Sequence, residues 1–415
     1  MMVHNPPSGA RDLLPLDVAQ KQWIERRVQQ VFESWGYHRI ITSTLERLDT
    51  LTAGGAVRRS TTIQFQDSDK ELLGLRPELT ASIARAAATR LTGASYPQRL
   101  YYNANVFRQD RKSALGSQHE FYQAGVELIG AGGAIADAEI LLLLGDCVRR
   151  LGIERWSLVL GEAEFTRSLL EPFPAPMRDR VRHAIAHLDR VAIENIPLSD
   201  SLRDRALFLM DLRGRPEDVL QRVAQLELGE TERNGLERLK SAIEVLRECG
   251  DDGNPLQEAI VLDLSLIQPF DYYTGVVFEV VGHTDDNAVV LGQGGRYDQL
   301  LGLYHPEGET APGIGFSLNI EDLHRVLLPT GQLPDRTRAS HYLVVPKTER
   351  ANAAALAYAC QLRQSDERRV EIELGVRQTP EAIRDYARDR AIGQIAWMAE
   401  DGTPEIEAMG DRSSD

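Results

Sequence analysis

The chain has 415 residues, of which 42% are hydrophobic and 26% are charged. This is the composition of a globular protein, and the length allows two or three domains around a large core. The formal net charge is −15, so the surface repels a phosphate backbone unless it carries a local basic patch. Nucleic-acid binding is therefore disfavoured as the main function.

The cysteines and the chain's start point to the cytoplasm. Cys147, Cys249 and Cys360 are odd in number, far apart and without a CxxC pair, which is typical of a reducing compartment. Residues 1–5 do not resemble a signal peptide, and the most apolar run, residues 140–144, is too short to span a bilayer. We expect a cytoplasmic protein with no metal site and no cofactor.

The first part of the chain is predicted to form an antiparallel sheet with few helices between its strands. Amphipathic spacing predicts helices over residues 19–35, 79–91 and 135–151. Strands are predicted over residues 39–41, 99–108 and 120–129, with a hairpin formed by residues 62–66 and 71–75. Residues 165–247 are rich in Arg, Glu, Leu and Ala at helical spacing, which indicates a helical insertion over about residues 165–255.

Strands resume after the insertion, over residues 260–264, 275–281, 289–291 and 313–317, and a helix follows over residues 320–327. A glycine-rich turn is expected at residues 292–295, and a polar linker over residues 329–337. Because helices do not alternate regularly with strands, residues 1–330 are predicted to be α+β rather than a doubly wound sheet. Alternating strands and helices predict a small α/β domain over residues 338–409, before a disordered tail, residues 410–415.

Two motifs suggest sites but have simpler explanations. Gly292-Gln293-Gly294-Gly295 lacks the Gly-Lys-Ser/Thr of a phosphate loop, so its glycines are better explained by a tight turn with close backbone approach. His183 and His187 are four residues apart on a predicted helix, but an HExxH zinc motif needs Glu where this chain has Ala184. Both histidines are expected to face solvent.

Three polar segments could line a ligand pocket, and each has a structural alternative. Gln123 and Glu127 lie on one face of a predicted strand, which could also be an exposed polar face. Glu78 and Thr80 stand where a strand meets a helix, and could hold an ammonium group or cap that helix. Tyr272 and Tyr273 are expected to face opposite ways on a strand, one towards a pocket and one towards the core.

In order and over nearly the whole chain, these segments resemble histidyl-tRNA synthetase, a class II synthetase. The opening Pro7-Ser8-Gly9-Ala10-Arg11-Asp12-Leu13-Leu14-Pro15 is similar to the start of that family. The other matching segments are Leu75-Arg76-Pro77-Glu78-Leu79-Thr80, Val106-Phe107-Arg108 with His119-Glu120-Phe121-Tyr122-Gln123, Asp271-Tyr272-Tyr273-Thr274-Gly275, Gly294-Gly295-Arg296-Tyr297-Asp298 and Gly313-Ile314-Gly315-Phe316. The resemblance implies a class II antiparallel core and a C-terminal domain like an anticodon-binding domain.

The departures from the family concern the activation of the amino acid. Gln268 stands where the family has an arginine that stabilises the α-phosphate of ATP, and glutamine carries no charge. Asp322 replaces an arginine that clamps the γ-phosphate, and Ser117 and His119 replace arginines of the motif 2 loop. The resemblance therefore implies that the catalytic positions are lost and that aminoacylation is absent.

The positions that contact histidine in the family are kept. The resemblance assigns Glu78, Thr80 and Gln123 to the α-amino side and Glu127 to the imidazole N–H, with Tyr272 and Tyr273 beside it, and Arg108 is a retained cation. A pocket that hydrogen-bonds a ring N–H discriminates strongly against side chains without one. A retained pocket without phosphate clamps indicates a histidine sensor rather than a catalyst.

Such a sequence resembles the non-catalytic members related to this family, the regulatory subunits of ATP phosphoribosyltransferase. That likeness implies a short-form catalytic subunit as partner, histidine as ligand, and feedback on the first step of histidine biosynthesis. It also implies a homodimer within a hetero-octamer, although Thr42-Ser43-Thr44-Leu45-Glu46 lacks the proline that motif 1 usually has. The alternatives are an active synthetase and a tRNA-binding relative.

Overall fold

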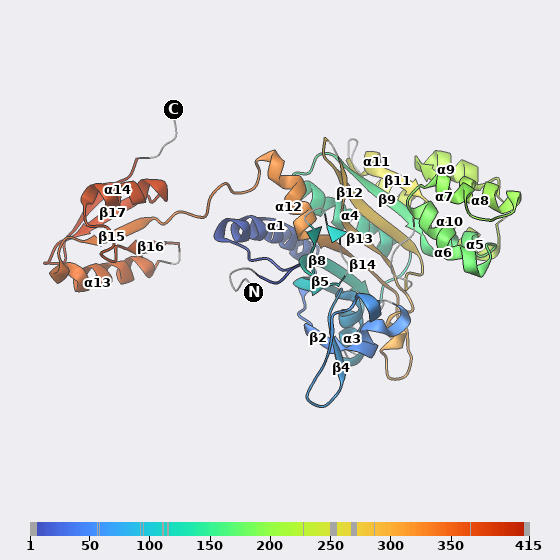
Figure 1. Ribbon diagram of the computed structural model, residues 1–415, viewed down its shortest axis with the longest axis horizontal. Coiled ribbons are helices and arrows are strands. Elements are labelled where there is room, and N and C mark those ends of the chain that lie inside the picture. The colour runs from blue at the N-terminus through green and yellow to red at the C-terminus, as the bar shows by residue number, and fades with distance from the viewer. Residues whose placement is uncertain are drawn as a thin grey trace. The chain divides into compact units, whose positions relative to one another are not determined.

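The computed structural model describes residues 6–55, 57, 59–91, 93, 95–109, 112–113, 116–226, 228–249, 255–266, 272–285, 287–365 and 367–410. The chain divides into two compact units, Met1–Pro334 and Asp335–Asp415 (Figure 1). Among the described residues, no helix is both long and apolar enough to cross a membrane.

The described part of the first unit is centred on a nine-stranded sheet of order β1-β5-β8-β14-β13-β12-β9-β11-β10. Its strands are β1 (His38–Arg39), β5 (Gln98–Phe107), β8 (Glu120–Ile129), β9 (Trp156–Glu162), β10 (Arg213–Gly214), β11 (Ile260–Asp263), β12 (Val276–His283), β13 (Ala288–Arg296) and β14 (Gly313–Asn319). Every pair from β5 to β9 along the sheet is antiparallel. With its helices grouped apart from these strands, the unit is α+β, as predicted.

The two faces of this sheet bury different clusters. Helices α1 (Pro15–Ser34), α4 (Ala134–Arg150) and α12 (Ile320–Leu327) cover one face over the main apolar core. Helix α3 (Thr80–Arg90) packs with a smaller, aromatic cluster on the other face. Strand residues alternate between faces, so Val126 and Leu128 of β8 join the main core, whereas Phe121 joins the aromatic cluster. Gln123 and Glu127 therefore point to the aromatic face.

In the chain, a block of helices follows β9 and precedes β11, and most of it is drawn in green at one end of the sheet (Figure 1). It comprises α5 (Ala163–Leu170), α6 (Ala175–Ala186), α7 (Arg190–Glu194), α8 (Asp200–Met210), α9 (Pro216–Val223), α10 (Glu230–Glu248) and α11 (Pro255–Ala259), with the short strand β10 among them. Helix α10 is amphipathic: Leu236, Leu239, Ile243 and Leu246 recur every three or four residues and are buried, and α10 packs against α4 and α5.

A small three-stranded sheet, β2-β4-β3, lies near α3. Strands β2 (Leu45–Arg47), β3 (Gln64–Gln66) and β4 (Leu72–Leu75) pair antiparallel, and α2 (Leu48–Thr52) follows β2. The turn between β3 and β4 is closed by the carboxylate of Asp67, which accepts hydrogen bonds from the backbone N–H groups of Asp69 and Glu71, both at 2.9 Å. The predicted hairpin is therefore present. A two-stranded sheet, β6 (Lys112–Ser113) with β7 (Gly116–Ser117), lies in the loop after β5.

One expectation about the first unit's strands was wrong, and one strand was missed. Residues 292–295 do not form a turn: they lie inside β13, paired with β12 on one side and β14 on the other. The close backbone approach expected of their glycines is confirmed, because a Cβ on Gly294 would lie 2.3 Å from the carbonyl oxygen of Gly315. Strand β9 was not predicted at all, although it occupies an inner position in the sheet.

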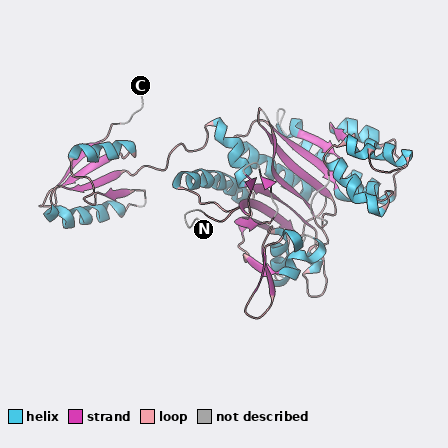
Figure 2. Cartoon of the chain, viewed as in Figure 1, coloured by secondary structure: helices cyan, strands magenta, loops and turns pink. Residues whose placement is uncertain are grey.

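The second unit is a four-stranded sheet of order β16-β15-β17-β18 with a helix on each face (Figure 2). Its elements are β15 (Tyr342–Pro346), α13 (Asn352–Arg363), β16 (Val370–Ile372), α14 (Pro380–Asp389), β17 (Gln394–Met398) and β18 (Pro404–Ala408). Helix α13 packs on Val344, and α14 packs on Leu343 and Val345, which face the opposite way. The antiparallel edge strand β18 was not predicted.

Candidate functional site

One pocket on the aromatic face of the large sheet gathers most of the residues singled out in the sequence. It is lined by Glu78, Thr80, Tyr102, Arg108, Gln123, Tyr272, Tyr273, Gln293, Tyr297, Gly315, Phe316 and Ser317. The space between these atoms, including the mouth open to solvent, is about 340 Å³. Its inner part leaves room for roughly a single water, so a larger ligand must displace side chains.

The deepest polar group beside this pocket is the carboxyl group of Glu127, which is 1% exposed. The hydroxyl of Thr80 donates a hydrogen bond to its Oε1 at 2.7 Å, and the hydroxyl of Tyr297 donates to its Oε2. On the neighbouring strand Gly315 leaves the necessary room, because a Cβ there would lie 2.1 Å from Oε2. Glu127 therefore belongs to a built polar site, and the alternative of an exposed polar face is wrong.

Burial shifts the protonation of this carboxyl group. Loss of solvation raises the pKa of Glu127 to about 8, and the negative charge of Glu78 adds to the rise, while the hydrogen bonds from Tyr297 and Thr80 oppose it. Both donors are neutral hydroxyls, which stabilise the anion less than a cation does. At neutral pH the empty pocket therefore holds Glu127 mainly in its protonated form.

Glu78 caps a helix, one of the two roles that the sequence left open, and it also lines the pocket. Its carboxylate accepts hydrogen bonds from the backbone N–H groups of Thr80, at 2.5 Å, and Ala81, at 2.9 Å, and so it caps the first turn of α3. It also lines the pocket and is 5% exposed. Burial raises its pKa, and those hydrogen bonds and the nearby charge of Arg108 oppose the rise.

Arg108 supplies a positive charge to the pocket. It follows β5, and its Nε donates a hydrogen bond to the carbonyl oxygen of Pro77 at 2.8 Å. Its guanidinium carbon lies 5.3 Å from the centre of the Phe121 ring, within the range of a cation–π contact. Because one edge of the guanidinium is fixed in this way, the group has a defined orientation beside Glu78.

Tyr272 and Tyr273 both line the pocket, so the expectation that they face opposite ways was wrong. They precede β12 instead of lying in it, and their ring centres are 4.8 Å apart. The ring of Tyr273 lies over Gly295, where a Cβ would be 2.7 Å from a ring carbon. The glycine-rich segment of β13 thus makes room for a wall of the pocket.

Several pocket residues were missed in the sequence. Tyr102 and Tyr297 are buried in the aromatic cluster, and Gln293 and Ser317 come from the adjacent strands β13 and β14. Tyr297 could have been found, because it lies in the segment 294–298, which resembles the synthetase family. Gln123 lines the pocket, which is the position predicted for it. Its amide donates a hydrogen bond to Oδ1 of Asn319 at 3.2 Å.

Of the two positions interpreted as lost catalytic residues, only Asp322 lies within the described residues. Gln268 lies outside the described residues. Asp322 lies on α12 and forms an ion pair with Arg325 at 2.6 Å, so part of its charge is balanced within its own helix. Of the motif 2 replacements, Ser117 is described only through its backbone in β7. The backbone N–H of His119 donates a hydrogen bond to the carbonyl oxygen of Gly9 at 2.8 Å.

The histidine pair away from the pocket is at the surface. His183 and His187 are exposed at the end of α6, with ring centres 4.1 Å apart. Over the residues that the structure describes, no group of three or more His, Cys, Asp or Glu side chains is placed to hold a metal ion.

Comparison with known proteins gives this fold and pocket a family. The sequence model of histidyl-tRNA synthetase matches residues 9–323. A regulatory subunit of ATP phosphoribosyltransferase from Nostoc punctiforme is 62% identical, and the alignment covers 98% of this chain and 100% of the relative. A regulatory subunit with the same name from a Nostoc species is 60% identical, with the same coverage.

Solved structures agree with these sequence relatives. A crystal structure from Bacillus halodurans, titled an ATP phosphoribosyltransferase regulatory subunit/histidyl-tRNA synthetase, has a TM-score of 0.77 and 27% identity, and the match covers 93% of this chain and 97% of that one. Histidyl-tRNA synthetase from a Nostoc species has a TM-score of 0.75 at 20% identity, covering 98% and 97%, which shows the shared fold. The chain therefore belongs to the family of ATP phosphoribosyltransferase regulatory subunits, which has the fold of the histidyl-tRNA synthetases.

Proposed function

We propose that this chain binds free histidine in the pocket and transmits its presence to a catalytic subunit of ATP phosphoribosyltransferase. In this role it supports the first step of histidine biosynthesis and makes that step responsive to histidine, without itself catalysing aminoacylation. The observation that carries the proposal is the buried carboxyl group of Glu127, held by the hydroxyls of two lining residues beside a pocket that Glu78 and Arg108 also line.

The chemistry of the pocket matches the three polar ends of histidine. Arg108 can pair with the carboxylate of the ligand, because its guanidinium is the cation among the lining residues. Glu78 can accept from the ammonium group, since each carboxylate oxygen has a second lone pair beyond those used at the start of α3. Glu127 can accept from the imidazole N–H, with Tyr272 and Tyr273 beside the ring, and Gln123 can join Glu78 at the ammonium group.

The direct test has two arms. Calorimetry with histidine measures binding to this chain alone and to its complex with a short catalytic subunit. We expect histidine to bind, and a Thr80→Val variant to bind it more weakly because Glu127 loses one donor. Formation of phosphoribosyl-ATP is then assayed with and without this chain. No binding in either preparation would refute histidine sensing, and unchanged catalytic activity would refute the supporting role.

The alternatives make opposite predictions. An active synthetase would catalyse histidine-dependent pyrophosphate exchange, and a tRNA-binding relative would retard tRNA in a gel with strong dependence on salt. We expect neither. In the second unit the charges also disfavour a polyanion, since Lys347, Arg377 and Arg384 are already paired with carboxylates.

We also propose a homodimer formed through α1 and motif 1, assembled with catalytic subunits into a hetero-octamer. Ile41, just before the motif 1 segment, is 80% exposed, and Leu45, within it, is 45% exposed. Such exposure is unusual for apolar side chains of this size. Sedimentation of an Ile41→Asp variant is expected to show a shift from dimer to monomer, whereas Leu188→Asp, a change at an exposed leucine of the helical block, is expected to leave the dimer intact.

A further inference from the structure

We infer that Arg167 and Arg238 are positioning residues that connect the pocket wall at Tyr273 to the helical block. Through them, ligand binding in the pocket changes the packing of α5 and α10. The inference rests on the proposed function, because it names the route by which occupancy of the pocket leaves the site. It assigns a purpose to the block, which contributes no residue to the lining of the pocket.

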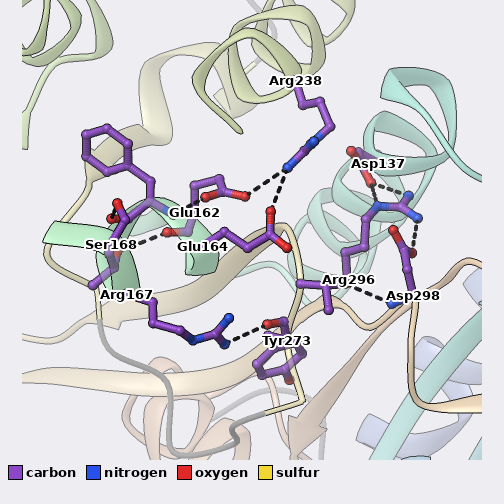
Figure 3. Close-up of polar contacts among 12 residues, drawn as sticks. Asp137, Glu162, Glu164, Arg167, Ser168, Arg238, Tyr273, Arg296 and Asp298 are labelled. Atoms are coloured by element: carbon purple, nitrogen blue, oxygen red, sulfur yellow. Dashed lines mark hydrogen bonds and ion pairs between the residues drawn. The ribbon is translucent and has the colours of Figure 1, made fainter. Parts of the chain in front are cut away.

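The pocket wall is attached to α5 at two points. The guanidinium of Arg167, on α5, donates a hydrogen bond to the carbonyl oxygen of Tyr273 at 3.2 Å (Figure 3). The backbone N–H of Ala163, the first residue of α5, donates to the carbonyl oxygen of Gly275 at 2.8 Å. Thus the short segment that bears the pocket tyrosines is bonded to the first two turns of one helix.

The start of α5 is in turn fitted against α10. The buried carboxylate of Glu162 accepts from the backbone N–H of Phe165 at 2.5 Å and so caps α5. Arg238, on α10, lies 3.4 Å from Glu162 and 3.2 Å from Glu164, bridging both carboxylates (Figure 3). Gly235 allows this contact, since a Cβ there would lie 2.9 Å from the carboxylate of Glu162.

The opposite side of the wall is rigid. The backbone N–H of Thr274 donates to the carbonyl oxygen of Arg296 at 2.8 Å, and the guanidinium of Arg296 is paired with Asp137 and Asp298. Both Arg296 and Asp137 have side chains only 5% exposed. A packed, paired interior resists displacement, and the Tyr273 ring already lies against Gly295.

Ligand entry is therefore expected to move the wall towards α5. The open space in the pocket is too small for an amino acid without a shift of its lining, and the paired Arg296 opposes a shift of the wall on its side. The link on the α5 side runs through Arg167, whose side chain is exposed and can follow a shift. Arg238 then passes the movement of the α5 cap to α10, which packs on α4.

Hydrogen–deuterium exchange on the full chain tests this route. Saturating histidine is expected to change exchange at least about twofold in α5 and α10. In an Arg238→Gln variant, histidine should still bind, with the response in α10 lost. Arg167→Gln should lower histidine affinity roughly two- to tenfold, the range for one hydrogen bond. The matched control is Arg205→Gln, which removes an arginine bond to the Leu169 carbonyl oxygen within the same block and should change neither readout.

A second arm needs no ligand, and it separates this inference from the proposed function. Gly235→Ala pushes α10 away from Glu162 and should alter exchange in the peptide that contains Thr274 and Gly275. A wild-type chain that binds histidine with unchanged exchange in α10 overturns the route and leaves histidine sensing intact. Absence of histidine binding both to the chain alone and to its complex with the catalytic subunit overturns the sensing, whereas unchanged exchange of the wall peptide in Gly235→Ala overturns the route by itself. A variant whose thermal unfolding shows a folded chain is required for each comparison.

Discussion

The protonation of Glu127 predicts that histidine binding strengthens with pH. An imidazole N–H donates best to an ionised carboxylate, whereas the empty pocket favours the protonated group, with a pKa of about 8. Ligand binding must therefore expel a proton at neutral pH. Replacing the group by an amide, Glu127→Gln, removes the titration while keeping the size of the side chain.

The magnitude follows from the ionised fraction of Glu127. With a pKa of about 8, that fraction rises from roughly one-tenth at pH 7 to roughly three-quarters at pH 8.5. If histidine binds only the ionised form, its apparent affinity increases about eightfold over this interval. The amine of the ligand also titrates towards alkaline pH. At each pH the apparent histidine affinity of the wild type is therefore divided by that of the variant, so that the titration of the ligand cancels.

Calorimetry at several pH values in buffers of different ionisation enthalpy measures both the affinity and the protons released. The expected result is a wild-type to variant affinity ratio that rises about eightfold, with close to one proton released at pH 7. The Glu127→Gln chain should release none through this group. A ratio that stays flat between pH 7 and pH 8.5 would refute the assignment of Glu127 as a buried carboxyl group that must lose its proton to accept from the ligand.

Three further changes have defined outcomes. In the absence of ligand, the unfolding free energy of Glu127→Gln should rise relative to the wild type between about pH 5 and pH 8, by up to about 1.4 kcal/mol per pH unit in urea unfolding. The reason is that, over this range, the wild-type carboxyl group ionises in the unfolded chain but not in the folded one. Equal pH slopes of the unfolding free energy for both chains would contradict this. Gly315→Ala should cost about 1–3 kcal/mol of stability and abolish histidine binding in calorimetry, since its Cβ overlaps Glu127, whereas Gly93→Ala, with nothing within 4 Å, should do neither. Arg296→Met should lower the unfolding free energy by about 3–5 kcal/mol, because Asp137 stays buried without its partner, and adding Asp137→Asn should recover part of that loss.

The architecture was largely predictable because the strong patterns were long. Helix α12 was predicted at its observed bounds, and the strands β5 and β8 to within one residue. Strand β9 was not predicted because its residues are mostly buried whichever face of the sheet they point to. Trp156–Glu162 therefore lacks the alternation of apolar and polar residues that identifies a strand. The glycines at 292–295 suggested a turn. A single sequence cannot show that neighbouring strands on both sides need the space that a glycine leaves free.

The site was predicted by residue but not by arrangement. Glu78, Thr80, Arg108, Gln123, Tyr272 and Tyr273 share one pocket, and Glu127 lies directly behind Thr80. What the sequence could not give were contacts between distant segments, such as Tyr297 on Glu127 or Arg167 on Tyr273. The histidine assignments themselves remain predictions until binding is measured.

The glycines beneath the pocket have a consequence for changing its selectivity. At Gly125, Gly295 and Gly315 any larger residue would collide with a carbonyl oxygen, a tyrosine ring or a carboxylate. The floor is therefore closed to substitution, and redesign for another amino acid is confined to the walls. Thr80 and Gln123 are the adjustable positions, because their side chains line the space. A replacement at Thr80 has to keep a donor for Glu127, and a replacement at Gln123 has to keep a partner for Asn319. A library limited to such wall residues should yield folded proteins with altered ligands more often than one that includes the floor.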